Sequence, residues 1–89
     1  MLVALIAHDK PGALSIRTEN RTAHLAYIEK TGCVTLAGPF IEDGNMAGSL
    51  VILDVENMAA ANDWATNDPY AKAGLFSSVE ITEWKRVIG

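Results

Sequence analysis

Residues 2–7 read LVALIA, an unbroken apolar run that is ended by HDKPG at residues 8–12. A short apolar run bounded by charged and turn residues is typical of a strand that is buried on both faces. Residues 49–55, SLVILDV, show the same pattern. Two strands of this kind place apolar side chains on both faces of one sheet, and both faces must be shielded from water. This requirement decides the fold.

Caps and turn residues divide the rest of the chain into further elements. The expected elements are one or two helical turns over 13–19, a helix over 21–31, a strand over 33–37, a helix over 58–66 and a strand over 76–84. Asn20 and Asn57 are favourable N-caps, and Gly32 is a natural helix stop. Gly38–Pro39 is expected to end the second strand, and residues 42–45 (EDGN) are a hairpin-type loop.

The order β-α-β-β-α-β predicts an α+β fold of the ferredoxin-like kind, with an antiparallel four-stranded sheet and both helices on one face. We expect residues 1–89 to be a single domain. A chain of 89 residues has a thin core, yet 49% of its residues are hydrophobic and its mean hydropathy is +0.15. The surplus apolar surface predicts a pocket and a homodimer in which a second copy covers the open sheet face.

Charge and composition exclude several classes of protein. The net charge is −4, the pI is about 4.9 and the basic residues are scattered, so we expect no nucleic-acid partner and no membrane partner. The single cysteine, Cys33, rules out an intrachain disulfide and favours a cytoplasmic location. No zinc-ligand spacing and no phosphate-binding glycine motif is present, and no metal or cofactor is expected.

The predicted topology brings distant polar residues to the sheet edge where the first strand ends. We expect Asp9, Arg17, His24, Ser49 and Asp68 to meet there. If Asn20 caps the helix, His24 lies in its first turn, where the helix dipole favours a neutral imidazole. His24 is then the natural general base, Asp9 or Asp68 would hold its tautomer, and Arg17 would bind an oxyanion or a carboxylate.

Each of these residues also has a purely structural interpretation. His24 can be a surface or satisfied core histidine, and Ser49 can simply pack or pair at a strand start. Asp9 precedes Lys10–Pro11 and Asp68 precedes Pro69, both of which are ordinary turn sequences.

The chain resembles the YciI-like (YCII-related) domain family nearly from end to end. The matching segments, in order, are Asp9–Lys10, Arg17, Ala23–His24–Leu25, Ala37–Gly38–Pro39, Gly48–Ser49, Ala60–Ala61, Trp64–Ala65, Asp68–Pro69–Tyr70, Ala73–Gly74 and Lys85. The resemblance implies a dimeric α/β barrel with sheets packed face to face and a pocket in each protomer. It also implies that His24 is catalytic together with Asp9 or Asp68.

The sequence looks close to a branch of this family that dehydrochlorinates a chlorinated hydroxyhydroquinone to a hydroxyquinone. The first hypothesis is therefore a cofactor-independent lyase that acts on a small aromatic substrate. In it, the substrate is bound by Arg17, Ser49, Gly38 and Pro39. Arg17 and backbone N–H groups near Gly38 or Gly48 stabilise the developing enolate. The alternative is a non-catalytic ligand-binding or dimerisation module in which His24 and Asp68 only cap helices. The loop over residues 41–47 is shorter than in many members, which reshapes the pocket in either case.

Overall fold

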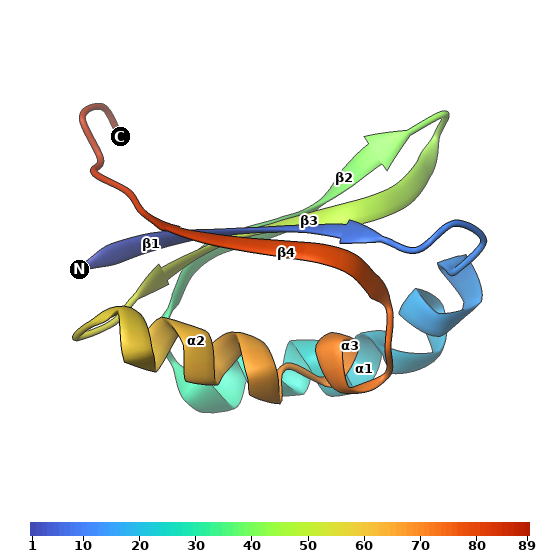
Figure 1. The fold of residues 1–89 in the computed structure, drawn as a ribbon, viewed down its shortest axis with the longest axis horizontal. Helices are drawn as coiled ribbons and strands as arrows, with labels where there is room; N and C mark the ends of the chain where they lie inside the picture. The colour runs from blue at the N-terminus through green and yellow to red at the C-terminus, as the bar shows by residue number, and fades with distance from the viewer.

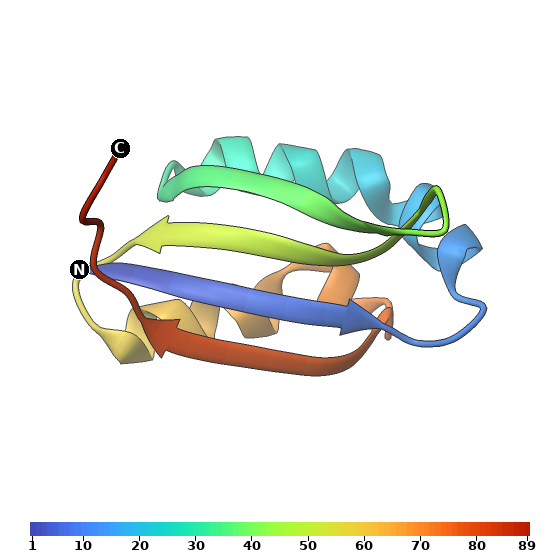
Figure 2. The same cartoon turned by 90° about the horizontal axis from the view of Figure 1, so that it is seen from above.

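A computed structural model describes residues 1–89 as one antiparallel sheet with a helical layer on one side (Figure 1). The elements in chain order are β1 (Leu2–Asp9), α1 (Leu14–Thr31), β2 (Val34–Glu42), β3 (Asn45–Asp54), α2 (Met58–Asn67), α3 (Pro69–Lys72) and β4 (Phe76–Glu83). The strand order is β2-β3-β1-β4 with every pair antiparallel, as Figure 2 shows from above. The predicted ferredoxin-like α+β fold is confirmed. None of the helices combines the length and the apolar character needed to cross a bilayer.

The first helix differs from the prediction, because α1 begins at Leu14 and runs without interruption to Thr31. The Asn20 side chain donates to the carbonyl oxygen of Ile16 within the helix, at 2.8 Å, and caps nothing. No proline or glycine lies between residues 14 and 31, so the short helical turns and the later helix join. The predicted stop at Gly32 is confirmed, since this residue adopts the left-handed conformation with φ 66°.

The second and third strands are longer than predicted and form one extended hairpin. The expected end of β2 at Gly38–Pro39 is wrong, because both residues lie inside the strand, paired with Leu50 and Ser49 of β3. Proline is tolerated there because β2 is an edge strand. The hairpin turns at Asp43 and Gly44, whose φ values of 50° and 79° identify a two-residue turn of the primed type.

The apolar core lies between the sheet and the helices. Leu5 on β1 is in register with Val51 of β3 and Ile81 of β4, and residues that face one another in this way share one face of the sheet. The core cluster consists of Val3, Leu5, Ala7, Val51, Leu53, Ala61 and Trp64. Two of its members belong to α2, whose predicted cap is confirmed by the Asn57 side chain accepting from the Ala60 amide at 2.9 Å.

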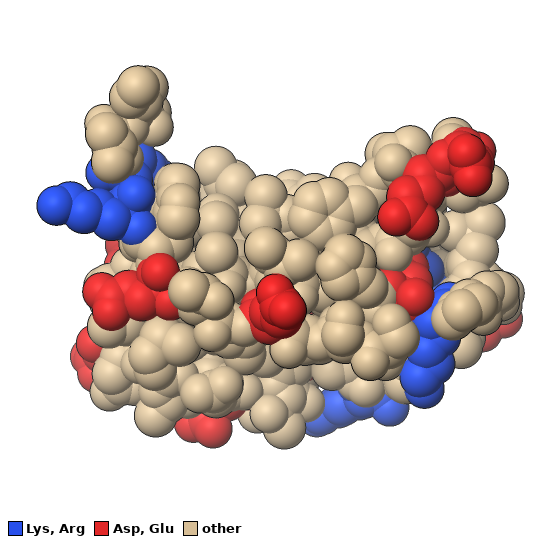
Figure 3. All heavy atoms as spheres, turned by 45° about the horizontal axis from the view of Figure 1, so that its top comes forward, with Lys and Arg blue, Asp and Glu red and all other residues tan.

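The opposite face of the sheet carries no helix (Figure 1). By register, its residues are Ala4, Ile6, Leu36, Phe40, Leu50 and Ile52, joined by His8, Ser78, Glu80 and Thr82. We call this the open face. Figure 3 shows few charged atoms over its middle and a shallow hollow between the C-terminal segment and the β2–β3 hairpin.

Candidate functional site

A buried imidazole–carboxylate pair joins the long helix to the short one. The Nδ1 atom of His24 lies 2.7 Å from Oδ1 of Asp68, and these residues are only 6% and 2% exposed. A carboxylate accepts hydrogen bonds, so this contact assigns the proton of a neutral imidazole to Nδ1. In that tautomer the lone pair is on Nε2, which makes no hydrogen bond within the protein. Such a ring can accept a proton at Nε2 while the carboxylate stabilises the resulting charge.

Local sequence explains how Asp68 is held in place. The helix α2 ends at Asn67 because Pro69 disfavours helical geometry at the residue before it. Asp68 therefore turns extended and becomes the N-cap of α3, with its Oδ1 accepting from the Tyr70 amide at 3.0 Å. The turn interpretation of Asp68 and the pairing with His24 are thus both correct, since one carboxylate does both.

A second buried pair lies at the end of β1. The Nε and Nη2 atoms of Arg17 each donate to a carboxylate oxygen of Asp9 at 2.8 Å, and Nη2 also donates to Oγ of Ser49 at 2.9 Å. Burial acts to lower the pKa of Arg17, but the hydrogen bond and the charge of Asp9 outweigh it, so this pKa is raised. Three of the five guanidinium donors are therefore engaged within the protein. Asp9 is the partner of Arg17, and the aspartate that pairs with His24 is Asp68.

Tyr70 links the two pairs. Its ring stacks on the His24 imidazole with a centroid distance of 3.9 Å and an interplanar angle of 14°. The guanidinium carbon of Arg17 lies 4.8 Å from the centre of the same ring, a cation–π arrangement. Burial raises the pKa of the Tyr70 phenol, and this effect outweighs the positive charges of Arg17 and Arg21, which act to lower it. Tyr70 is therefore a neutral hydrogen-bond donor at neutral pH.

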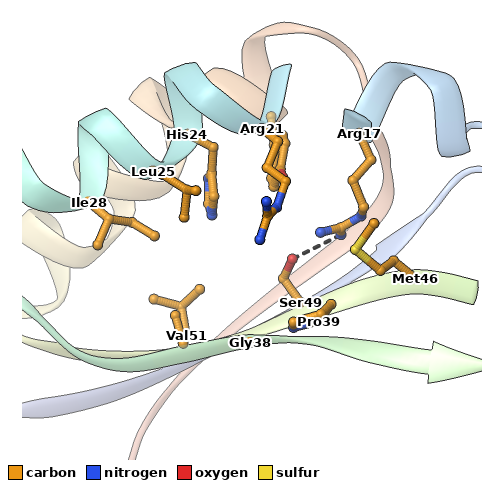
Figure 4. Close-up of a pocket in the computed structure, with 12 residues that line it drawn as sticks. Arg17, Arg21, His24, Leu25, Ile28, Gly38, Pro39, Met46, Ser49 and Val51 are labelled. Carbon is orange, nitrogen blue, oxygen red and sulfur yellow. Dashed lines mark hydrogen bonds between the residues drawn. The ribbon is translucent and has the colours of Figure 1, made fainter. Parts of the chain in front are cut away.

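These residues line a pocket of about 160 Å³ between α1 and the β2–β3 hairpin (Figure 4). The polar wall consists of Arg17, Arg21, His24, Ser49 and Tyr70. The remaining wall is formed by Leu25, Ile28, Ala37, Gly38, Pro39, Met46 and Val51. An apolar cavity of about 150 Å³ suffices for benzene, so the space suits a single six-membered ring.

The site is assembled differently from the prediction. It lies beneath the sheet and not at its edge, because α1 starts earlier and Gly38, Pro39 and Ser49 fall inside strands. His24 is the eleventh residue of α1, so the expected effect of the helix N-terminus on its imidazole is wrong. All of the predicted residues nevertheless lie at or beside the pocket, with Asp9 behind Arg17.

Two polar residues of the pocket, Arg21 and Tyr70, were not predicted as site residues. Arg17, Arg21 and His24 stand at positions i, i+4 and i+7 of α1, a spacing that places them on one helix face. This spacing is visible in the sequence once 14–31 is taken as one helix. Tyr70 belongs to the segment Asp68–Pro69–Tyr70 that matches the family, but no spacing in the sequence placed it at the site. No group of three or more histidine, cysteine, aspartate or glutamate side chains is arranged to hold a metal ion.

Comparisons with known proteins place the chain in a family. The model of the YCII-related domain matches residues 1–85, and the protein belongs to that family. An uncharacterized protein of Haemophilus influenzae and the protein YciI of Escherichia coli are each 36% identical to it over 97 residues, covering 98% of this chain and 99% of the relative. The aligned length exceeds the 89 residues of this chain, so these relatives carry residues that it lacks.

Among solved structures, the 5-chloro-2-hydroxyhydroquinone dehydrochlorinase TftG of Burkholderia phenoliruptrix is similar to this chain. The TM-score is 0.87 with 35% sequence identity, over 96% of this chain and 94% of TftG. TftG was solved in complex with 2,5-dihydroxybenzoquinone. An antibiotic biosynthesis monooxygenase, at 15% identity and a TM-score of 0.53, shares the fold alone.

Proposed function

We propose that this protein is a cofactor-independent lyase that eliminates HCl from a small chlorinated, hydroxylated aromatic compound and yields a hydroxyquinone. The observation that carries the proposal is the buried His24–Asp68 pair, whose free Nε2 belongs to a residue lining a pocket of single-ring size. The similarity to TftG supports the choice of reaction.

The proposed reaction needs no external oxidant. Nε2 of His24 takes a phenolic proton, and the imidazolium returns it to the ring carbon that carries chlorine. The C–Cl bond then breaks with its electron pair on chloride, while the regenerated Nε2 of His24 takes a second phenolic proton and the quinone forms. The conversion of the hydroquinone to the quinone is a two-electron oxidation, and it is balanced by the two-electron reduction of the carbon whose C–Cl bond is replaced by C–H. Proton transfer by a placed residue contributes about 10²–10⁴-fold to the rate.

Several residues complete this proposal. Asp68 holds the imidazole and stabilises its charged form, while Asp9 acts through Arg17 and Ser49 by keeping them in place. The Ser49 hydroxyl accepts from Arg17 and retains its own proton for an oxygen of the substrate. Gly38 and Pro39 form part of the wall across from α1.

The test is chloride release from 5-chloro-2-hydroxyhydroquinone by purified protein. His24→Ala and His24→Gln are expected to lower turnover by about 10²-fold or more while circular dichroism shows a folded chain. His8→Ala is the matched control, because His8 is the other histidine and lies on the open face. No chloride release by the wild type, or near-normal turnover by both His24 variants, would refute the proposal.

A non-catalytic ligand-binding module is the second candidate. It is favoured by one observation, namely that the His24–Asp68 contact bridges α1 and the start of α3 and so ties the helical layer together. This candidate predicts that His24→Ala lowers the free energy of unfolding and that no chlorinated hydroquinone is turned over. Tight binding of a small molecule by a wild-type protein without turnover would select it.

We further propose that two copies pack their open faces together as a homodimer. Leu36, on this face, is 52% exposed in the single chain, and neighbouring residues there are also apolar. Light scattering coupled to size exclusion should give twice the 9.5 kDa chain mass. Leu36→Glu should shift the protein to monomer because the interface would bury an unpaired carboxylate, whereas Ala59→Glu on the exposed side of α2 should not. A monomeric wild type would contradict this proposal.

A further inference from the structure

We infer that Arg21 is the anion-binding residue of the pocket and that the site selects single-ring ligands carrying an ionised oxygen over neutral rings of the same size. The choice of ring chemistry rests on the proposed function. The assignment of Arg21 rests on the placement and pairing of the charged groups around the pocket.

Arg21 is placed to contact a ligand. It lies one turn after Arg17 and just under one turn before His24 on the helix face that lines the pocket. Figure 4 shows its side chain extending into the pocket between those of Arg17 and His24, on the side towards Ser49. Unlike Arg17, which is 3% exposed, Arg21 is an exposed residue that a ligand can reach.

Arg21 is also the one cation at the pocket without a carboxylate. Asp9 is taken by Arg17 and Asp68 by His24, whereas Arg21 takes part in no ion pair and no side-chain hydrogen bond. With a neutral imidazole, the two carboxylates balance the two guanidinium groups around the pocket. The negative charges are held behind Arg17 and His24, so the unshared positive charge at the pocket is that of Arg21.

The chemistry of the remaining wall defines the rest of the ligand. Leu25, Ile28 and Val51 offer apolar surface to a ring, and the volume of about 160 Å³ admits one ring. Ser49 and the neutral phenol of Tyr70 are uncharged donors for hydroxyl or carbonyl oxygens. A planar guanidinium can donate two parallel hydrogen bonds, so Arg21 suits the adjacent oxygens of an ionised hydroxyquinone or catechol.

The experiment measures binding and needs no turnover. The probe is 2,5-dihydroxybenzoquinone, which is anionic at neutral pH because each hydroxyl is conjugated to a carbonyl as in a carboxylic acid. Hydroquinone is the neutral comparator of similar size. Titration calorimetry of each ligand is carried out with wild type, Arg21→Gln, Arg21→Lys and Lys30→Gln. Lys30→Gln is the matched control, since Lys30 lies on the same helix and outside the pocket.

Arg21→Gln is expected to weaken binding of the quinone by about 10-fold or more, as for the loss of a hydrogen bond to a charged group. Arg21→Lys should recover part of the affinity, and the Kd for hydroquinone should be the same in all four proteins. Quinone binding by the wild type should weaken with added NaCl because the contact is partly exposed to solvent.

Three results would overturn the inference: no binding of the quinone by the wild type, equal losses for both ligands, or a loss in Lys30→Gln as large as in Arg21→Gln. The proposed lyase activity fails separately. Binding of the anion that depends on Arg21, without chloride release, would support this inference and refute the proposed reaction. Chloride release together with unchanged quinone binding in Arg21→Gln would support the reaction and refute this inference.

Discussion

Two buried clusters share the space between the sheet and the helices, and they are built on opposite principles. The core cluster is entirely apolar and packs α2 against β1 and β3. The polar cluster, defined as Asp9, Arg17, His24, Ser49 and Asp68, joins α1 and the start of α3 to the C-terminal end of β1 and the middle of β3.

The difference lies in what each helix presents to the sheet. Through Ala61, α2 brings its backbone close to the strands, and the space is filled. Through Arg17, Arg21 and His24, α1 presents long polar side chains, and Ala37, Gly38 and Pro39 of β2 remain exposed across from it. The pocket exists because Arg17 and His24 are held by hydrogen bonds to defined partners, and the polar side chains of α1 do not fill the space beneath β2.

The polar cluster is tolerated inside the fold because its members satisfy one another. Burying a polar group without a partner is costly, and no buried side-chain nitrogen or oxygen in this protein lacks one. Removing one member of a pair should therefore lower the free energy of unfolding more than removing both members. Truncating a core residue should lower this free energy with little effect on the site.

The largest expected effect on stability is that of Arg17→Met. It leaves Asp9, whose side chain is 6% exposed, as a buried unpaired carboxylate, so the free energy of unfolding in urea should fall by about 3–5 kcal/mol. The double variant Arg17→Met/Asp9→Asn should lose clearly less than the sum of the two single variants. Strict additivity in this double-mutant cycle would show that the pair is not coupled as its geometry implies.

Leu5→Ala tests the other cluster. Leu5 is 2% exposed in the core, so truncation should cost about 2–5 kcal/mol of unfolding free energy through lost burial and a residual cavity. At a temperature where the variant remains folded, chloride release per mole should match the wild type. A fall in turnover comparable with that of His24→Ala would mean that the two clusters are not separable.

The smallest expected effect concerns alkaline pH. Burial raises the pKa of Tyr27 and of Tyr70 above the ordinary value of 10.0. Below that value both the folded and the unfolded chain keep these protons, so the two phenols add no pH dependence. Above it the unfolded chain releases protons that the folded chain still holds, and stability should decline as pH rises.

Urea unfolding at several values between about pH 9 and 11 measures this decline against the reference tyrosine pKa. Tyr70→Phe should make the alkaline slope shallower because one of the two raised groups is gone. An unchanged slope in Tyr70→Phe would show that the raised pKa of Tyr70 does not contribute to the alkaline loss of stability.

Most of the fold was predictable from local patterns. The apolar run over residues 2–7, the cap at Asn57 and the stop at Gly32 depend on near neighbours in the chain, and each prediction is confirmed. The start of α1 and the end of β2 were predicted wrongly. Asn20 has two ways to satisfy its side chain, and Pro39 is acceptable in a strand only if that strand is at an edge. Neither choice is decided by neighbouring residues.

The site was predictable as a set of residues but not as an arrangement. The sequence by itself determined the strand and helix order, and with it that Arg17, His24, Ser49 and Asp68 would come together, because topology follows from hydrophobic periodicity and turns. Only the tertiary structure decided that Asp68 holds His24, that Asp9 holds Arg17 and that Tyr70 stacks between the two pairs. Pairing depends on distances of a few ångströms between side chains far apart in the chain, and those distances are set by how the helices pack on the sheet.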